Sequence, residues 1–315
     1  MIEELNRLFA GNRSFLAGVL PAETDNSRSL RIVFTDENPD GVFITEFPAS
    51  SGIKSHAPDQ TEYIKLVALA VESIKKNLFQ KVVTSRIKSV DVSIDCAVIF
   101  DKMVKSYPGA FVYAFRTKDD DIWMGATPEL LLQKRGQKFR TVSLAGTQQR
   151  IPDLQYDQYL WGEKEIVEQQ IVTDFIVSEL KNAGCESVFH SEPVTSAAGN
   201  VVHRKTYIEF ESKLPLQTLV EILHPTPAVC GFPRPAATKF ILEHEPHRRS
   251  YYAGVVGLLK PDGDADLFVN LRCMRVNKDS IELFVGGGIT IDSIPENEWL
   301  ETELKSRTLL KLIEE

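Results

Sequence analysis

The sequence predicts an α+β fold with large antiparallel sheets and helices packed on them. Strand-like runs follow one another through short, turn-rich linkers, and three longer stretches repeat apolar residues at helical spacing. Consecutive strands joined by short turns favour antiparallel pairing, because parallel strands need a crossover of roughly a dozen residues or more. Neither a low-complexity tract, an internal repeat nor a break in composition marks a linker, so we predict one domain over residues 1–315.

The predicted strands are apolar runs bounded by turn residues. The linkers "TDENPD" and "KPDGDAD" favour turns, so the runs on either side of each are expected to pair as hairpins. The predicted strands are "SLRIVF" (29–34), "GVFITEF" (41–47), "FVYAFRT" (111–117), "DIWMGAT" (121–127), "KFRTVSLAG" (138–146), "YYAGVVGLL" (251–259), "LFVNLRCMRV" (267–276) and "SIELFVGGGIT" (280–290).

Three segments show the apolar spacing of amphipathic helices, namely 61–78, 163–184 and 296–315. Gly184 is placed as the stop of the second helix, because glycine readily adopts the left-handed conformation found just after a helix end. The segment 224–237 contains four prolines and a glycine, so we expect it to be a stiff loop.

Composition excludes several classes of protein. The chain is 43% hydrophobic and 25% charged, as in ordinary globular proteins, and its net charge of -8 argues against a nucleic-acid partner. The four cysteines form no C-x-x-C pair, which argues against a disulfide framework or a zinc site. No signal-peptide core is present at the N-terminus, and the longest apolar run, 66–71, is too short to span a bilayer. We therefore expect a cytoplasmic protein without a membrane partner, as a monomer or at most a weak dimer.

The second and third helices each present a pair of glutamates. Glu168 shares the apolar face of Val172 and Phe175, with Glu165 one turn earlier. A carboxylate on an inward face is costly unless a cation meets it, although Glu168 could also lie at the edge of the face, near the helix N-terminus.

In the C-terminal helix, Glu298 and Glu301 are three residues apart and Lys305 follows four residues later. A solvated Glu–Lys pair is one interpretation. The other is that both helices converge on one hard cation, for which magnesium fits better than zinc. The upstream glycines 286–288 do not complete a P-loop or a dinucleotide-binding pattern.

Two further residues could carry acid–base chemistry. Lys81 opens an apolar strand, where it could be an edge-strand lysine that prevents aggregation or a buried base. Glu129 follows Pro128 and precedes three leucines, so it could be a turn carboxylate or a desolvated acid. A lysine base and a glutamic acid on opposite sides of a substrate would suit addition of water with loss of a hydroxyl.

Three other polar residues lie in predicted strands or beside them. His203 is more often a structural histidine than a ligand in such a setting. Tyr252 and Arg272 could donate hydrogen bonds to a carboxylate or be ordinary surface residues.

A series of motifs runs in one order along the chain: "KVVTSR", "GATPELLL", "SLAGT", "KEIVEQQIV", "LHPTPAVCGFPR", "YYAGVVG", "LRCM" and "GGGITIDSIPENEWLETELK". In order and wording they resemble the chorismate-utilising enzymes from about residue 62 to the C-terminus. Residues 1–61 match weakly, and we expect them to form a shortened part of that family's outer sheet. The resemblance implies the anthranilate synthase component I or aminodeoxychorismate (ADC) synthase type of fold, in which antiparallel sheets form a sandwich covered by helices.

The resemblance also implies a role for each candidate residue. It assigns Glu168 and Glu301 to a magnesium ion, and Glu298 and Glu165 to the surroundings of that metal. The positions that match substrate contacts are Gly286, Gly287, Tyr252, Arg272, Lys305, His203 and Thr147. One departure is Gln169, which stands where many members have a histidine after the metal-binding glutamate.

The nucleophile is implied by two positions. Ammonia-using anthranilate synthases usually have glutamine at the place of Lys81, and aminodeoxychorismate synthases have a lysine at the place of Ala145. Lys81 with Ala145 resembles the water-using branch. There Lys81 would activate water to attack C2 of chorismate, and Glu129 would protonate the departing C4 hydroxyl, which makes isochorismate for menaquinone or a catecholate siderophore.

Three alternatives stay open from sequence. A salicylate synthase would form isochorismate and then eliminate pyruvate in the same pocket. A glutamine-amidotransferase-dependent anthranilate or aminodeoxychorismate synthase subunit would act with a second chain, and a degenerate binding protein would hold chorismate without turnover.

Overall fold

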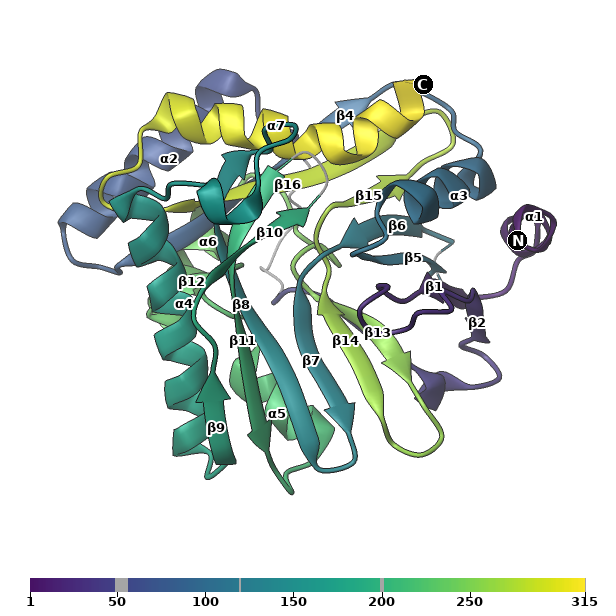
Figure 1. The fold of residues 1–315 in the computed structure, drawn as a ribbon. Coiled ribbons are helices and arrows are strands. Elements are labelled where there is room, and N and C mark those ends of the chain that lie inside the picture. The colour runs from purple at the N-terminus through teal and green to yellow at the C-terminus, as the bar shows by residue number, and fades with distance from the viewer. Residues whose placement is uncertain (49–55, 119, 199–200, 315) are drawn as a thin grey trace.

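The computed structural model describes residues 1–48, 56–118, 120–198 and 201–314, and contains two large antiparallel sheets (Figure 1). The first sheet has the strand order β12 (Gly231–Phe232), β4 (Lys81–Val90), β16 (Ile281–Ile289), β15 (Cys273–Val276), β6 (Ile122–Thr127), β5 (Phe111–Arg116), β1 (Phe15–Val19) and β2 (Arg31–Phe34). The second has the order β10 (Val194–Ala198), β11 (Val201–Glu211), β8 (Lys138–Gln149), β7 (Leu130–Arg135), β14 (Ala265–Val269), β13 (Val255–Leu259) and β3 (Val42–Thr45), with β9 (Glu186–His190) also paired to β11.

The two sheets form a sandwich because their facing side chains share one hydrophobic core. Phe111 of β5 stacks on Phe268 of β14 with ring centroids 4.7 Å apart. Along β5, Phe111, Tyr113 and Phe115 belong to this shared core, whereas Val112 and Ala114 pack in a second core on the outer face. This alternation follows from the two-residue period of a strand, which points successive side chains to opposite faces.

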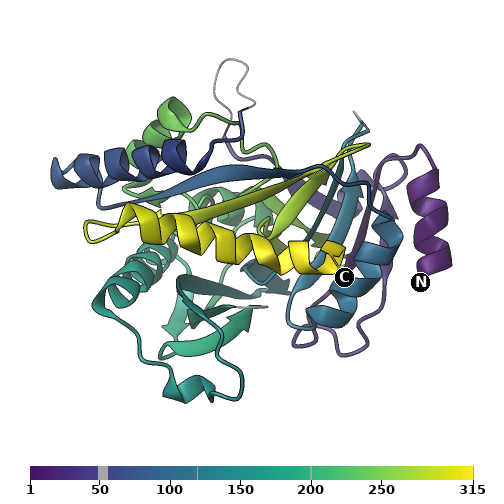
Figure 2. The same ribbon diagram turned by 90° about the horizontal axis from the view of Figure 1, so that it is seen from above.

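Helices cover both sheets. They are α1 (Ile2–Ala10), α2 (Gln60–Lys75), α3 (Cys96–Ser106), α4 (Glu163–Asn182), α5 (Leu216–Leu223), α6 (Arg234–His244) and α7 (Pro295–Glu314), with short 3₁₀ turns at Pro39–Gly41 and Tyr156–Gln158. Helix α7 packs on β16 and beside α2, as seen from above in Figure 2, and α4 packs on β8 of the other sheet. No helix in the described parts of the chain is long and apolar enough to cross a membrane.

The ends of the site-bearing helices follow from local chemistry. Helix α2 begins with a capping box, in which Asp59 and Glu62 satisfy each other's backbone N–H groups. Helix α7 begins at Pro295, whose fixed φ and missing N–H suit a first helical turn. Helix α4 ends at Asn182, and Gly184 has φ +75°, which confirms the predicted stop.

The antiparallel α+β prediction is confirmed, but several local predictions are wrong. The runs 29–34 and 41–47 do not form a hairpin, because β2 pairs with β1 in the first sheet while β3 pairs with β13 in the second. The segment 224–237 is not all loop. It contains β12 and the start of α6, since Pro233 and Pro235 lie where a helix begins and a missing N–H has no cost there.

Candidate active site

A pocket opens where α4, α7 and the glycine-rich end of β16 meet the strands of the second sheet. It encloses about 630 Å³ of space, part of it open to solvent. The predicted residues that line it are Glu129, Thr147, Glu168, His203, Tyr252, Arg272, Gly286, Gly287 and Lys305. Three more, Glu165, Glu298 and Glu301, line an adjoining groove that shares Thr147 with the pocket. The structure therefore brings together residues that lie far apart in the sequence.

The glycines of β16 make room for carboxylates. A Cβ on Gly288 would lie 2.2 Å from Oε1 of Glu168, and a Cβ on Gly287 would lie 3.2 Å from Oε2 of Glu298 and 3.6 Å from Oε1 of Glu301. The absence of side chains here lets carboxylates from α4 and α7 approach the strand backbone. Close approach, and not a phosphate cradle, is the physical reason for the glycine run.

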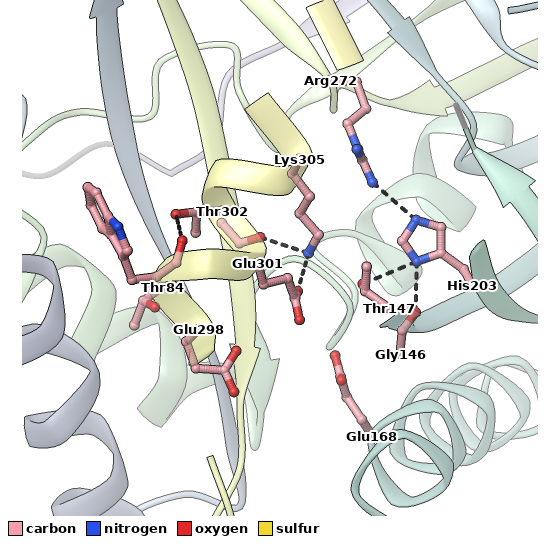
Figure 3. A network of polar contacts seen from close by, with 12 residues as sticks. Thr84, Gly146, Thr147, Glu168, His203, Arg272, Glu298, Glu301, Thr302 and Lys305 are labelled. Carbon is pink, nitrogen blue, oxygen red and sulfur yellow. Dashed lines mark hydrogen bonds and ion pairs between the residues drawn. The ribbon is translucent and has the colours of Figure 1, made fainter. Parts of the chain in front are cut away.

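Each of these carboxylates is paired with an ammonium group. Lys305 Nζ lies 2.6 Å from Glu301 Oε1, as Figure 3 shows. The same ammonium also donates a hydrogen bond to the Gly286 carbonyl. Lys81 Nζ lies 3.1 Å from Glu168 Oε1. Lys164 Nζ lies 2.5 Å from Glu298 Oε1.

Lys81 is the first residue of β4 and is completely buried. Because β4 lies between β12 and β16, Lys81 is inside the sheet, and the interpretation as a protective edge lysine is wrong. Its Nζ is an ion-pair partner of Glu168 but makes no hydrogen bond of standard geometry to the described residues. This amine is thus held beside the pocket with free donor capacity.

Glu129 lies between β6 and β7, where Pro128 interrupts the strand as predicted. Its side chain is only 4% exposed. Burial raises the pKa of Glu129 to about 7, against the opposing influence of Lys81, Lys305 and Arg272. A carboxyl group with that pKa can donate a proton near neutral pH.

His203 and Arg272 form a chain of hydrogen bonds at the far wall of the pocket (Figure 3). Nδ1 of His203 lies 2.7 Å from the Gly146 carbonyl, and Nε2 lies 3.1 Å from an Arg272 Nη2. The carbonyl can only accept and the guanidinium can only donate, so the neutral ring carries its proton on Nδ1. Burial and the neighbouring Arg272 hold the pKa of His203 well below its usual range.

Arg272 is fixed from the other side as well. Its Nη1 donates a 2.8 Å hydrogen bond to Thr308 of α7. Burial lowers the pKa of Arg272 to about 10, so the guanidinium stays charged at neutral pH. Its backbone has φ +49°, at the point where the chain leaves β14 in one sheet and enters β15 in the other. The predicted strand 267–276 is therefore broken at this residue.

The remaining predicted residues complete the pocket wall. The Thr147 hydroxyl lies 3.3 Å from Nδ1 of His203. Tyr252 is 4% exposed, and burial raises the pKa of its hydroxyl, which stays protonated as a donor. Apolar side chains, among them Val83, Leu144 and Val229, supply the rest of the lining.

Two residues have positions that sequence reasoning did not give. Lys164 was not among the candidates, although it stands one turn before Glu168 on the same helix. Gln169 is 1% exposed and its side-chain amide donates to Ser143, Thr173 and Thr206, so it ties α4 to the second sheet and does not face the pocket.

The carboxylates fit a hard divalent cation in their chemistry. They offer oxygen donors only, they converge on the backbone of Gly287 and Gly288, and Oε2 of Glu298 is buried and accepts no hydrogen bond of standard geometry within the described ranges. Within those ranges no three His, Cys, Asp or Glu side chains are close enough to enclose a metal as they stand. Magnesium needs only one or two protein carboxylates besides water and substrate oxygens, so the donor set is sufficient.

Comparison with known proteins agrees with this geometry. Residues 38–314 match the family model described as chorismate binding enzyme. The chain is 34% identical over 266 residues to isochorismate synthase EntC of Escherichia coli (strain K12). This match covers 81% of this chain and 68% of that protein.

Two solved structures are similar. A 2,3-dihydroxybenzoate-specific isochorismate synthase, DhbC, of Bacillus anthracis has a TM-score of 0.78 and 27% identity, covering 98% of this chain and 86% of that chain. Anthranilate synthase component I of Streptococcus pneumoniae TIGR4 has a TM-score of 0.70 at 22% identity and shows the same fold. The match covers 84% of this chain and 62% of that chain. The extent of the family match and the identity to EntC together show that this chain belongs to the family of chorismate-binding enzymes.

Proposed function

We propose that this enzyme is an isochorismate synthase, which adds water at C2 of chorismate and expels the hydroxyl at C4, to supply menaquinone or siderophore synthesis. The observation that carries the proposal is a buried amine beside the pocket, Lys81, which pairs with Glu168 of the pocket wall, and a buried carboxylic acid in the wall itself, Glu129, with a pKa of about 7. Ala145 in the pocket wall leaves no lysine there for amine chemistry. The relatives' names agree with this choice.

Chorismate would be held by its two carboxylates. Arg272 and Lys305 supply charged donors and Tyr252 supplies a neutral one, all lining the pocket. The backbone of Gly286 and Gly287 allows a carboxylate to approach the strand closely. The apolar wall holds the ring and limits the water around it.

Lys81 would act as the base. A water molecule between its amine and C2 loses a proton to Nζ as the new C2–O bond forms. Both ring double bonds then shift by one position, from C1=C2 to C1=C6 and from C5=C6 to C4=C5. Since an ammonium ion cannot accept a proton, Lys81 must first separate from Glu168 and lose its own proton.

Glu129 would act as the acid. The bond from C4 to its hydroxyl breaks, and the carboxyl proton of Glu129 passes to that oxygen, which leaves as water. One water is consumed and one is released, so the reaction is an isomerisation. After product release, Lys81 returns a proton and Glu129 regains one through solvent.

We further propose that Glu168 and Glu301 hold a magnesium ion, with Glu298 and Glu165 around it. When bound, such an ion supplies positive charge that neutralises the ring carboxylate and orients it. The chain is proposed to act as one domain over 1–315, since both sheets contribute to one shared core and both line the substrate pocket.

The test is a product chromatogram from chorismate with purified protein, with and without Mg²⁺. The expected result is isochorismate that depends on Mg²⁺. Salicylate fluorescence without a partner enzyme would replace the proposal with a salicylate synthase. Anthranilate formed from added ammonia would indicate the amidotransferase-dependent class, and unchanged chorismate would indicate a binding protein.

A further inference from the structure

Lys164 reaches from α4 across the groove to α7. Its Nζ lies 2.5 Å from Oε1 of Glu298, and the two side chains are 24% and 1% exposed. The pair therefore consists of a carboxylate inside the protein and an ammonium whose stem reaches solvent. Lys164, Glu165, Glu298 and Glu301 line the same open groove.

Lys164 differs from the other two lysines that meet the carboxylates. Lys81 and Lys305 are accounted for by the proposed reaction, as base and as carboxylate ligand. Lys164 does not line the substrate pocket, and among the described residues it forms its hydrogen bond and ion pair with Glu298. Its ammonium is the positive charge nearest to a carboxylate whose other oxygen, Oε2, is buried and without a hydrogen bond of standard geometry from the described residues.

We propose that Lys164 is an internal counter-ion that competes with the divalent cation for the negative charge of Glu298, beside the proposed ligands Glu168 and Glu301, and thereby sets the affinity of the enzyme for Mg²⁺. The inference rests on the metal site of the proposed function. A buried carboxylate needs a cation, and Lys164 fills that need when no metal is bound. When the metal binds, the two cations beside Glu298 repel each other, and the flexible lysine stem can carry its ammonium out to solvent.

The pairing also accounts for a feature of the groove. No three acidic, histidine or cysteine side chains in the described residues are close enough to enclose a metal, although three carboxylates face the same two glycines. Each of the three is instead paired with an ammonium group. Lys164 is the partner that can leave without removing a group from the substrate pocket.

A purely positioning role makes the opposite prediction. If Lys164 served to hold Glu298 in place for the metal, its removal would weaken Mg²⁺ binding. If Lys164 competes with the metal, its removal strengthens binding. The size of the change in the apparent Kd for Mg²⁺ follows from the fraction of molecules in which Glu298 is free. When Lys164 occupies Glu298 in about nine molecules of ten, the apparent Kd is raised about tenfold.

The experiment is a calorimetric titration of the full chain with MgCl₂ in the absence of chorismate. We expect Lys164→Met to lower the Kd for Mg²⁺ about tenfold. The matched control is Lys88→Met, which removes one positive charge of similar exposure, 28%, from a 2.7 Å ion pair with Glu303 on α7. It should leave the Kd within about twofold of the wild type, since repulsion through solvent is screened.

Thermal melting supplies a second measurement. Without metal, Lys164→Met should melt at a lower temperature than the wild type because Glu298 loses its partner, and Mg²⁺ should raise its melting temperature by more. If Lys164→Met fails to fold, Lys164→Arg replaces it, because a guanidinium can engage both carboxylate oxygens and should bind Mg²⁺ no more tightly than the wild type.

The outcomes separate the inference from the function on which it rests. Wild-type binding of Mg²⁺ with equal or weaker binding by Lys164→Met, or tighter binding by Lys164→Arg, overturns the role of Lys164 and leaves the metal site standing. Absence of Mg²⁺ binding by the wild type and by both lysine variants overturns both. Glu301→Gln shows what loss of the metal site looks like. It should abolish the heat of Mg²⁺ binding both in the wild type and in combination with Lys164→Met.

Discussion

Replacing Glu129 with glutamine should separate its catalytic role from its cost to stability. The pKa of this buried carboxyl is raised from 4.5 to about 7, which corresponds to about 3 kcal/mol of disfavoured ionisation. At pH 7 about half of the molecules carry the acid form, against roughly 0.3% for a carboxyl of ordinary pKa. The pocket thus raises the fraction of molecules in which Glu129 is protonated at pH 7 on the order of a hundredfold.

For the reaction, kcat of the wild type should fall as pH rises above about 7, because Glu129 then loses the proton it donates. Glu129→Gln cannot donate, so its kcat should be lower by about a hundred- to ten-thousandfold. Initial rates of isochorismate formation between pH 6 and pH 9 measure both effects. Wild-type rates in Glu129→Gln would remove Glu129 as the acid.

For stability, the sign follows from proton binding. Between pH 4.5 and about 7 the folded state binds more protons at Glu129 than the unfolded state does, so the free energy of unfolding decreases as pH rises. Above pH 7, Glu129→Gln should therefore be more stable than the wild type by up to about 3 kcal/mol, and near pH 4.5 this advantage should vanish. Urea unfolding at the two pH values checks it, and an equal difference at both would contradict the burial argument.

The remaining predictions concern the base and the metal site. Lys81→Ala should nearly abolish hydration, by about a hundredfold or more, while chorismate binding stays measurable by calorimetry; wild-type turnover would exclude Lys81 as the base. Glu301→Ala should weaken both activity and the response to Mg²⁺, so an unaltered magnesium titration would show that the metal lies elsewhere. Gly288→Ala should impair Mg²⁺ binding because its Cβ would lie 2.2 Å from Oε1 of Glu168, whereas Gly109→Ala, with open space around it, should not.

Much of the fold could be predicted from residue spacing alone. The helices α2, α4 and α7 lie within a few residues of the predicted segments, because capping groups, prolines and Gly184 mark their ends locally. The pairing of strands was less predictable. Strands β2 and β3 are joined by a turn-rich linker yet belong to different sheets, since their partners β1 and β13 are chosen by tertiary packing.

The site was predictable in its membership but not in its geometry. Local spacing could not decide whether Lys81 was at a sheet edge or inside the sheet, because that depends on β16 and β12, which lie about two hundred or one hundred and fifty residues away in the chain. Lys164 was missed for a related reason. Its partner Glu298 is on another helix, and the reach of a long side chain between helices leaves no periodic pattern in the sequence.

The central claim is that a water molecule, activated beside Lys81, adds to C2 while the C4 hydroxyl departs. The most direct measurement is mass spectrometry of isochorismate formed from unlabelled chorismate in ¹⁸O-enriched water. The account predicts one ¹⁸O atom in the product, attached at C2. Isochorismate that carries no label would mean that the hydroxyl moves within the molecule, and would contradict the mechanism.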